Sequence, residues 1–374
     1  PYLRVKRGNR TVSTQPQLFS NLKKTEMEDF NRRDFIKGVV GAGISLITAD
    51  SLASVSMDLA RIKNPYDAKG LPTTELGKTG VIIPKIVLGL GSRFCHIDED
   101  EEAYEMLNYA LDNGFYYWDT AHAYDNTIAV PPGKKKSPRH IISEVRVGEV
   151  VKYRRKEIFL STKVTAREPA ESMKEIELSL KRLNTDKLDM LKIHDVQSIE
   201  DVNQMSRKGH LIDILHRLKE EGITRFIGFS GHGDAQALKE LANRGDFDSM
   251  LVAMNHWNPK QPSPRQEIAV PAGKKNKMGV LIMKAVRPKE TIPGLHAPDL
   301  IRYALSLKGP DAVVIGMDSK AVVNSNLEIL RNFKKLSPEQ MKELAVQLEP
   351  FYRHENLPWM QDNYIDGMWE TISV

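Results

Sequence analysis

The sequence predicts the α/β class, as a closed (β/α)8 TIM barrel that carries an extra C-terminal helix and a tail. Short apolar runs alternate with longer amphipathic runs from Ile83 onward, and Gly, Asn or Asp stands at many of the joins. In addition, eight strand candidates fit into roughly 250 residues, the usual size of such a barrel.

The strand candidates are short runs of apolar, β-branched and aromatic residues. In chain order they span 82–91, 115–121, 158–164, 188–194, 224–231, 249–255, 280–286 and 311–317. The runs between them space apolar residues by three and four, which is typical of amphipathic helices. Clear helices are expected at 100–114, 169–184, 210–222, 234–245 and 298–309, with weaker matches at 141–153 and 266–278.

The chain continues beyond the eighth unit. Ser337 can cap a further helix, with Pro338 at its first position and Glu339 behind it. The tail at 357–370 is expected to pack across one end of the barrel.

The composition limits the chemistry open to the chain. Cys95 is the only cysteine, which excludes an intrachain disulfide and any metal or iron-sulfur centre held by several thiolates. The acids of "CHIDEDEE" are expected to favour the start of the first helix rather than to bind a metal. A Rossmann domain is disfavoured, because "LGLGSRF" lacks the third glycine of the GxGxxG motif. Redox chemistry would need a dissociable cofactor.

The formal net charge of +5 lies in the N-terminal segment. Residues 1–63 hold eleven Lys or Arg and six Asp or Glu, and the remaining residues hold 43 of each sign. A neutral body without an aromatic and basic stripe argues against a nucleic-acid partner.

Residues 1–63 are expected to form an N-terminal extension and 64–374 the barrel domain. Arg32 and Arg33, followed by an apolar run and then by small residues before Ala53, resemble a twin-arginine export signal cleaved near residue 53. The run is shorter than the ~20 apolar residues that cross a membrane, so no stable span is expected in the mature protein.

This signal implies the twin-arginine export machinery as a partner and the periplasm as the destination. A basic tail followed by an amphipathic helix is the alternative. Met27 stands shortly before the paired arginines, so residues 1–26 are expected to precede the native start.

Polar residues fall at the C-terminal ends of neighbouring strands, which form the reaction face of such a barrel. Asp119 lies near the end of the second strand, Lys163 near the end of the third and His194 at the end of the fourth. Tyr124 follows Asp119 on the next loop. Because neighbouring strands lie about 4.8 Å apart, these side chains can converge. Lys192 could rival Lys163 but would lie one layer deeper.

Such a cluster can transfer a proton. A free tyrosine has a pKa around 10, and a neighbouring ammonium group lowers it by favouring the phenolate. Lys163 would lose its charge on burial without a carboxylate partner, which Asp119 supplies. His194 can hydrogen-bond a substrate carbonyl oxygen and set its angle of approach.

Each residue also has a structural interpretation. Asp119 could cap a helix, Tyr124 could pack at the rim, Lys163 could be a surface lysine and His194 a core histidine. Their joint position on adjacent strand ends favours catalysis over these four separate coincidences.

The stretches "WDTAHAYD", "IFLSTKV" and "LDMLKIH" resemble the aldo-keto reductase family in residue type, order and strand position, within a likeness covering about 71–333. The resemblance implies an NAD(P)-dependent oxidoreductase that reduces a carbonyl substrate, or oxidises the matching alcohol, with Tyr124 as general acid/base. A nicotinamide-binding sensor or accessory protein with little turnover is the alternative, because free cofactor is scarce outside the cytoplasm.

The resemblance also implies a nicotinamide cofactor across the barrel mouth. In "IGFSGH", Ser230 matches the family's Ser-Asn pair, Gly231 replaces the Asn and His232 is a candidate substitute. Asn255 is the candidate where the family carries Gln. The other candidate cofactor residues lie near the ends of the first, seventh and eighth strand candidates or follow them: Ser92, Lys284, Gly316, Ser319, Lys320 and Asn326.

The type of cofactor depends on the eighth-strand loop. The family's arginine for the 2′-phosphate is missing near Val322, and Lys320 could replace it as a point charge. NADP(H) is therefore favoured only slightly over NAD(H). A plain barrel turn is the alternative for this loop.

The long loop at 130–140, directly after Tyr124, carries three lysines and Arg139. Such a loop would favour an anionic or acid-bearing carbonyl substrate. A solvated run of charges is the alternative, and the composition favours it.

Overall fold

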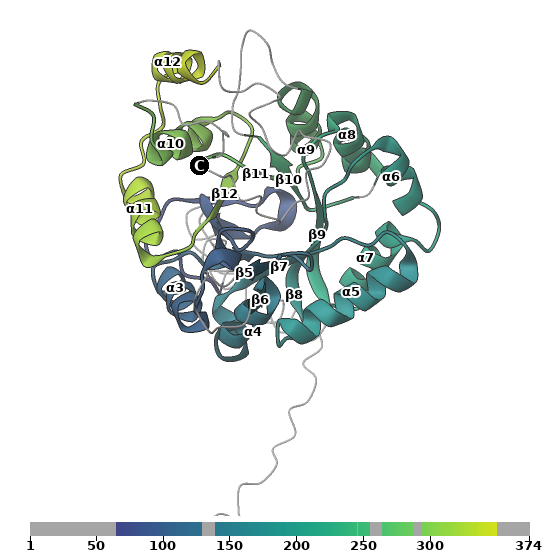
Figure 1. Cartoon of the computed structure of the whole chain (residues 1–374). Helices are drawn as coiled ribbons and strands as arrows, with labels where there is room; N and C mark the ends of the chain where they lie inside the picture. The colour runs from purple at the N-terminus through teal and green to yellow at the C-terminus, as the bar shows by residue number, and fades with distance from the viewer. Residues whose placement is uncertain (1–64, 129–138, 245, 255–263, 287–293, 350–374) are drawn as a thin grey trace, which may run out of the picture. The chain divides into compact units, whose positions relative to one another are not determined.

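The computed structural model describes residues 65–128, 139–244, 246–254, 264–286 and 294–349. Eight parallel strands close into a barrel, so the predicted (β/α)8 fold is confirmed (Figure 1). In order around the ring they are β3 (Ile86–Gly89), β4 (Tyr117–Asp119), β7 (Phe159–Val164), β8 (Leu188–Ile193), β9 (Thr224–Gly231), β10 (Ser249–Ala253), β11 (Gly279–Met283) and β12 (Ala312–Gly316). Pairing of β12 with β3 closes the ring.

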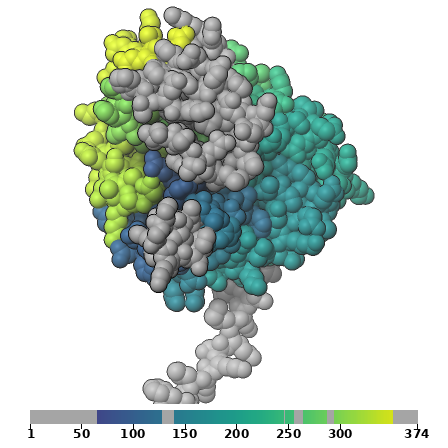
Figure 2. All heavy atoms as spheres, viewed as in Figure 1, coloured from purple at the N-terminus to yellow at the C-terminus, as the bar shows by residue number. Residues whose placement is uncertain are grey.

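Helices surround the strands, as expected for repeated βα units. They are α3 (Asp100–Asp112), α4 (Ser143–Arg154), α5 (Pro169–Arg182), α6 (Ile199–Met205), α7 (Leu211–Glu220), α8 (Ala235–Arg244), α9 (Val270–Lys275), α10 (Ala297–Ser306) and α11 (Lys320–Arg331). The surface formed by α5 to α8 is continuous in the space-filling view (Figure 2). The predicted extra helix is α12 (Pro338–Leu348), and the Ser337 hydroxyl caps it by accepting from Gln340 N at 3.2 Å.

The first strand candidate is divided in two. Residues Ile82–Pro84 form β2, which pairs antiparallel with β1 (Thr73–Glu75), and only Ile86–Gly89 enters the barrel. Pro84 lies at the break, because it has no N–H with which to continue a ladder. A second hairpin, β5 (Asp125–Ile128) with β6 (Arg139–Ile142), follows the second barrel strand.

The two weaker helix matches have physical causes. Helix α4 buries the polar residues Ser143, Glu144 and Arg146, so its buried face cannot be recognised from the spacing of apolar residues alone. The segment before α9 is a π-helical turn, Arg265–Ala269. Gly273 then lets α9 approach β10, since a Cβ there would lie 2.2 Å from Met250 Sδ.

Short 3-10 turns complete the connections, at Gly77–Thr79, Phe94–His96 and Arg155–Glu157. The N-terminal extension with its cleavage position, the tail at 357–370 and Asn255 lie outside the described residues. Within the described part of the chain, no helix combines the length and apolar character needed to cross a membrane.

Candidate active site

Three of the four predicted catalytic residues are in direct contact at the C-terminal ends of the strands. Lys163 Nζ donates to the Tyr124 hydroxyl at 3.0 Å and lies 2.7 Å from Asp119 Oδ2. Lys163 Nζ also donates to Thr120 O at 2.9 Å. The residues are buried, with 1% of Lys163, 2% of Asp119 and 7% of Tyr124 exposed. The ammonium group therefore bridges a carboxylate and a phenol away from bulk water.

The loop after β4 positions Tyr124 beside Lys163. His122 N donates to Lys163 O at 3.1 Å, and Ser143 N donates to Tyr124 O at 2.9 Å. Gly91 leaves room for the phenol ring, because a Cβ at that position would lie 3.3 Å from a ring carbon of Tyr124. Backbone hydrogen bonds to two neighbouring elements thus hold the loop that carries the tyrosine.

Two lysines share Asp119. Lys192 Nζ lies 2.5 Å from Asp119 Oδ1 and 3.2 Å from the hydroxyl of Tyr117, which precedes Asp119 by two residues on β4. Burial by itself would raise the pKa of Asp119, but Lys163 and Lys192 together outweigh burial and hold that pKa at about 2. The carboxylate is therefore ionised at neutral pH and forms an ion pair with each of the two lysines.

The fourth predicted residue, His194, follows β8 directly. Its ring lies edge-on to the Tyr124 ring, with 5.5 Å between centroids and 83° between planes. His194 N donates to Val164 O at 2.8 Å, and its Nδ1 lies 3.4 Å from Thr165 Oγ1. The structure therefore brings all four predicted residues together, with His194 against the Tyr124 ring and Asp119 reaching Tyr124 through Lys163.

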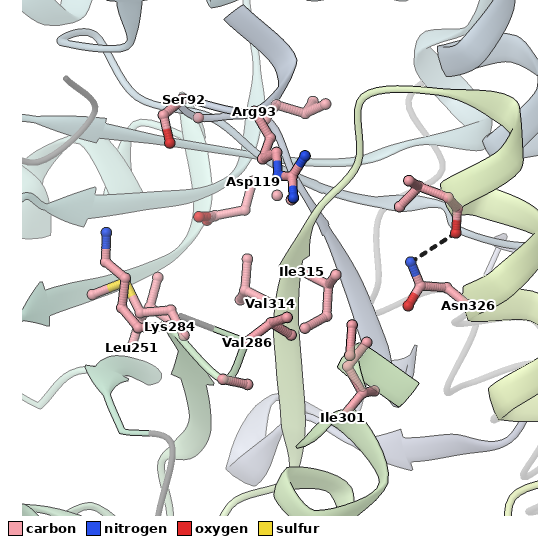
Figure 3. Close-up of a pocket in the computed structure, with 18 of the residues that line it drawn as sticks. Ser92, Arg93, Asp119, Leu251, Lys284, Val286, Ile301, Val314, Ile315 and Asn326 are labelled. Atoms are coloured by element: carbon pink, nitrogen blue, oxygen red, sulfur yellow. Dashed lines mark hydrogen bonds between the residues drawn. The ribbon is translucent and has the colours of Figure 1, made fainter. Parts of the chain in front are cut away.

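A cavity of about 300 Å³ adjoins this cluster. Ser92, Asp119 and Lys284 lie toward one end of it and Asn326 at the other (Figure 3). The wall between the polar ends is mostly apolar and includes Leu251, Met283, Val286, Ile301, Val314 and Ile315. An apolar cavity with a few polar groups is typical of a small-molecule site.

Four predicted cofactor residues line the cavity, namely Ser92, Lys284, Gly316 and Asn326. Asn326 is 2% exposed, and its Nδ2 donates to Val322 O at 3.0 Å. Its Oδ1 has no hydrogen-bond partner among the described residues. A buried acceptor costs free energy unless a donor meets it. The residues present therefore fit a ligand that brings a hydrogen-bond donor to Asn326, as the amino group of a nucleotide base would.

The other predicted cofactor residues contact the protein itself. Ser230 Oγ accepts from Asp195 N at 3.0 Å, and His232 Nδ1 lies 2.6 Å from Asp195 Oδ1. Ser319 caps α11 by accepting from Val322 N, and Lys320 Nζ donates to Glu105 Oε2 at 2.7 Å. Their assignment to cofactor binding stays a prediction, as does that of Asn255.

Arg93 is a cavity residue that the sequence did not indicate. Its Nη1 lies 2.6 Å from Asp318 Oδ2, so the pair joins the loop after β3 to the loop after β12. A Cβ on Gly316 would lie 3.1 Å from Arg93 Cβ, which shows how closely the two loops approach. The partners are 225 positions apart, so no local pattern could have revealed them.

The lone cysteine lies beside the cluster without joining it. Cys95 packs with Ala121, Tyr124 and Ile141, and burial raises the pKa of its thiol to about 12. The thiol is therefore protonated at neutral pH and a poor nucleophile. Among the side chains that the structure describes, no three His, Cys, Asp or Glu residues are grouped closely enough to hold a metal ion.

Comparison with known proteins agrees with this arrangement. The model of the aldo/keto reductase family matches residues 85–286, which is more than half of the chain. L-galactose dehydrogenase of Arabidopsis thaliana is 26% identical over 328 residues, which cover 76% of this chain and 95% of that protein. Prostaglandin F synthase 1 of Bos taurus is 28% identical over 181 residues, but these cover 44% of this chain and 52% of the relative.

A solved structure gives the same fold. The holo form of the aldo-keto reductase AKR11C1 from Bacillus halodurans superposes with a TM-score of 0.59 and 20% sequence identity, covering 74% of this chain and 96% of that chain. With the family match, the barrel and the converged polar cluster together, the chain belongs to the aldo/keto reductase family and is an NAD(P)H-dependent oxidoreductase.

Proposed function

We propose that the enzyme reduces a small carbonyl compound, or oxidises the matching alcohol, with Tyr124 as general acid and base. The single observation that carries this proposal is the position of Lys163, whose ammonium lies 3.0 Å from the Tyr124 hydroxyl and 2.7 Å from Asp119. An ammonium group at that distance stabilises the phenolate left when Tyr124 gives up its proton.

The residues divide the work of proton transfer. In the reducing direction, the Tyr124 O–H bond breaks, its proton passes to the substrate oxygen and the electron pair stays on the phenolate. His194, edge-on to Tyr124, donates a hydrogen bond to the same oxygen and orients the carbonyl group. Asp119 keeps Lys163 charged throughout, because its carboxylate remains ionised.

The cavity residues would hold the nicotinamide dinucleotide, which when bound supplies or accepts the hydride. Asn326 Oδ1 would accept from the amino group of the base, and the Lys284 ammonium would face a negatively charged part of the cofactor. NADP(H) remains slightly favoured over NAD(H). Lys320 is the candidate for the 2′-phosphate, and its ion pair with Glu105 would have to open first.

The substrate class is open between two chemistries. The likeness to L-galactose dehydrogenase supports testing aldoses. The loop at 130–140 supports testing acid-bearing carbonyl compounds, although Arg139 already lies 3.2 Å from Glu99 and 2.8 Å from Asp100. Those two carboxylates offset the charge of Arg139, which favours aldoses and neutral carbonyl compounds.

The N-terminal segment has its own proposed role. We propose that residues 31–53 form a twin-arginine signal that takes the folded enzyme to the periplasm, and that the barrel domain begins near residue 64. Residues 27–63 fused to a reporter should be exported, and replacing Arg32 and Arg33 with Lys should retain the reporter inside the cell. Equal export of both fusions would refute the signal.

The catalytic proposal is tested by Tyr124→Phe, assayed by cofactor absorbance with a panel of aldehydes, ketones and aldoses. We expect kcat to fall by about 10²- to 10⁴-fold, because that is the usual contribution of a general acid, while the cofactor dissociation constant stays within about threefold. Tyr66→Phe is the matched control, since it also removes a hydrogen-bonded tyrosine hydroxyl, but one that is partly buried and bonded to Asp189. Full activity of Tyr124→Phe would remove Tyr124 from the mechanism. No turnover of any carbonyl by the wild type would favour a sensor.

A further inference from the structure

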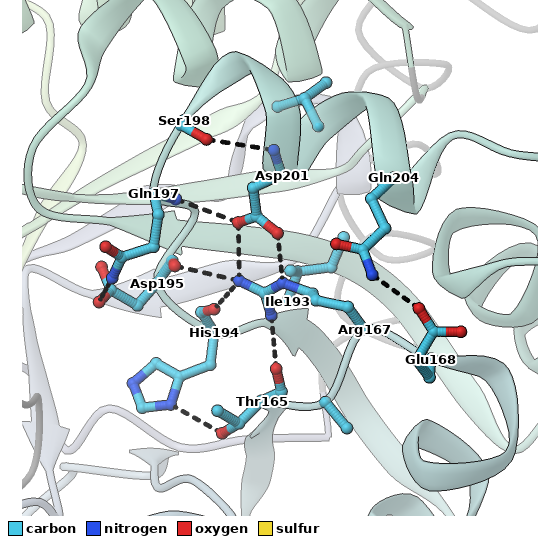
Figure 4. A network of polar contacts seen from close by, with 12 residues as sticks. Thr165, Arg167, Glu168, Ile193, His194, Asp195, Gln197, Ser198, Asp201 and Gln204 are labelled. Carbon is cyan, nitrogen blue, oxygen red and sulfur yellow. Dashed lines mark hydrogen bonds and ion pairs between the residues drawn. The ribbon is translucent and has the colours of Figure 1, made fainter.

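We propose that Arg167 is a positioning residue that fixes the backbone on which His194 stands, and thereby sets where its imidazole meets the substrate. This inference rests on the proposed role of His194. Arg167 lies on the loop after β7, four residues beyond Lys163, and contacts the loop after β8 that carries His194 (Figure 4).

The guanidinium group binds three backbone carbonyl oxygens from two loops. Nη1 donates to Thr165 O at 2.8 Å, and Nη2 donates to His194 O at 2.8 Å and to Asp195 O at 3.0 Å. These contacts connect the end of the strand that carries Lys163 to the end of the strand that carries His194. Beyond the pairing of β7 with β8, Arg167 therefore adds a side-chain link between the two loops that follow these strands.

Asp201 holds the guanidinium in place. Arg167 Nε and Nη2 lie 2.7 Å and 3.0 Å from the two carboxylate oxygens of Asp201, the two-pronged geometry that is strong and directional. Asp201 is itself fixed, because its N–H donates to Ser198 Oγ and its Oδ2 accepts from Gln197 N. Side-chain exposure is 15% for Arg167 and 12% for Asp201.

The backbone next to His194 needs such support. Asp195 has a φ of 48°, in the left-handed region that an L-residue occupies at a cost. Arg167 binds the carbonyl oxygens on both sides of this residue's nitrogen and α-carbon, while Ser230 Oγ accepts from its N–H. Without Arg167, the tight turn after β8 would relax toward ordinary backbone angles and the imidazole would move with it.

The same arginine also fixes what the imidazole touches. Thr165, whose carbonyl oxygen accepts from Nη1, places its hydroxyl 3.4 Å from His194 Nδ1. Every nitrogen of the guanidinium already has a protein partner, so Arg167 acts through His194 and does not bind substrate. The role of Arg167 goes beyond its ion pair with Asp201, because three of the five contacts of its guanidinium group are to the backbone of the two loops.

The decisive experiment is a double-mutant cycle of Arg167→Met and His194→Ala, read as kcat/KM. Arg167→Met should lower kcat/KM by about 10- to 100-fold, the usual cost of a displaced catalytic group, but should change it by less than about threefold when His194 is already Ala. Arg167→Lys should not rescue the loss, because one ammonium cannot span the carboxylate and three carbonyl groups. Asp201→Asn should give a smaller loss.

Arg154→Met is the matched control. Arg154 also makes a two-pronged pair, with Glu157 at 2.9 Å and 2.7 Å, and its side chain is 22% exposed, but it stands at the far end of α4. Its loss should leave kcat/KM within about twofold, since a partly exposed ion pair contributes little and this one does not contact the loops of the site.

A second measurement needs no turnover. The imidazole signal of His194 in a proton NMR spectrum, assigned by its absence in His194→Ala, should shift or broaden in Arg167→Met and stay unchanged in Arg154→Met. If Arg167→Met does not fold, Arg167→Lys and Asp201→Asn can be compared with Arg154→Met in the same two measurements, the His194 signal and kcat/KM.

The outcomes separate the two proposals. An unchanged His194 signal in Arg167→Met, or an equal loss of kcat/KM with and without His194, would overturn the positioning role even if Tyr124→Phe is inactive. A shifted His194 signal in Arg167→Met, together with full activity of both Tyr124→Phe and His194→Ala, would instead overturn the proposed catalytic mechanism. It would still support the role of Arg167 in holding the backbone at His194.

Discussion

Two buried aspartates in this barrel are surrounded by the same kinds of groups and differ in what those groups can do. Asp119, at the end of β4, contacts Lys163 and Lys192, and Lys163 reaches Tyr124. Asp189, near the start of β8 and thus at the opposite end of the barrel, contacts Arg155 and Arg225 at 2.9 Å and 2.6 Å and accepts from the Tyr66 hydroxyl at 2.6 Å. Each cluster therefore holds a carboxylate, two cations and a phenol.

The partner of the phenol distinguishes the two clusters. Tyr66 donates to a carboxylate, and burial together with Asp189 raises the pKa of its hydroxyl. Tyr124 instead accepts from an ammonium group, which favours the loss of its proton. Similar groups thus hold a proton on Tyr66 at one end of the barrel and, in the proposed mechanism, prepare the proton of Tyr124 for transfer at the other.

The two clusters also differ in their access to the cavity and in the exposure of their cations. Asp119 and Tyr124 line the cavity, whereas Tyr66 stacks on Tyr116 with 5.1 Å between ring centroids. The side chains of Arg155 and Arg225 are 25% and 41% exposed, so water shares in balancing Asp189, while Lys163 and Lys192 are 1% and 0% exposed. The lysines around Asp119 therefore depend on ion pairs within the protein more than the arginines around Asp189 do.

The largest expected difference comes from neutralising each carboxylate. Asp119→Asn leaves two buried ammonium groups without a counter-charge, so the free energy of unfolding should fall by about 3–5 kcal/mol and kcat by more than about 100-fold. Asp189→Asn should cost about 1–2 kcal/mol and leave kcat within about threefold, because its arginines reach solvent. Urea denaturation and steady-state assays measure both. Equal losses of activity in the two variants would break the comparison.

A sharper test separates the two lysines that share Asp119. Lys163→Met should lower kcat by about 10²- to 10³-fold, because it removes the cation beside the Tyr124 hydroxyl. Lys192→Met should lower kcat by less than about tenfold, since Lys192 contacts Tyr117 instead, although it should destabilise the fold as much. Inactivity of Lys192→Met with an unchanged melting temperature would show that the deeper lysine has the catalytic role.

The smallest expected effect is the dependence of stability on pH. The pKa of Asp119 is about 2 in the folded chain and has an ordinary value of 3.8 when unfolded. A lowered folded-state pKa stabilises the protein above pH 4 and loses this contribution as the pH falls toward 2, about 2 kcal/mol in all. The difference in unfolding free energy between wild type and Asp119→Asn should shrink by that amount from pH 6 to pH 2. A constant difference would show that the charges of Lys163 and Lys192 do not hold Asp119 ionised.

The sequence was informative where the signal is local and periodic. Alternating strand and helix patterns gave the barrel, and the polar residues that close the second, third and fourth strands gave the cluster around Tyr124. Two helices were hard to predict for local reasons as well. The buried face of α4 mixes polar residues with valines, and α9 carries Pro271 and Gly273, so apolar spacing could not mark either helix well.

By itself, then, the sequence determined the barrel, the order of its strands and the identity of the groups at their ends, because parallel neighbours in a closed barrel must present their C-terminal residues on one face. Only the tertiary structure decided that Asp119 contacts two cations, and that Arg167 ties the His194 loop to the loop after the Lys163 strand. These depend on side-chain direction and reach across strands, which residue order leaves undetermined until the barrel closes.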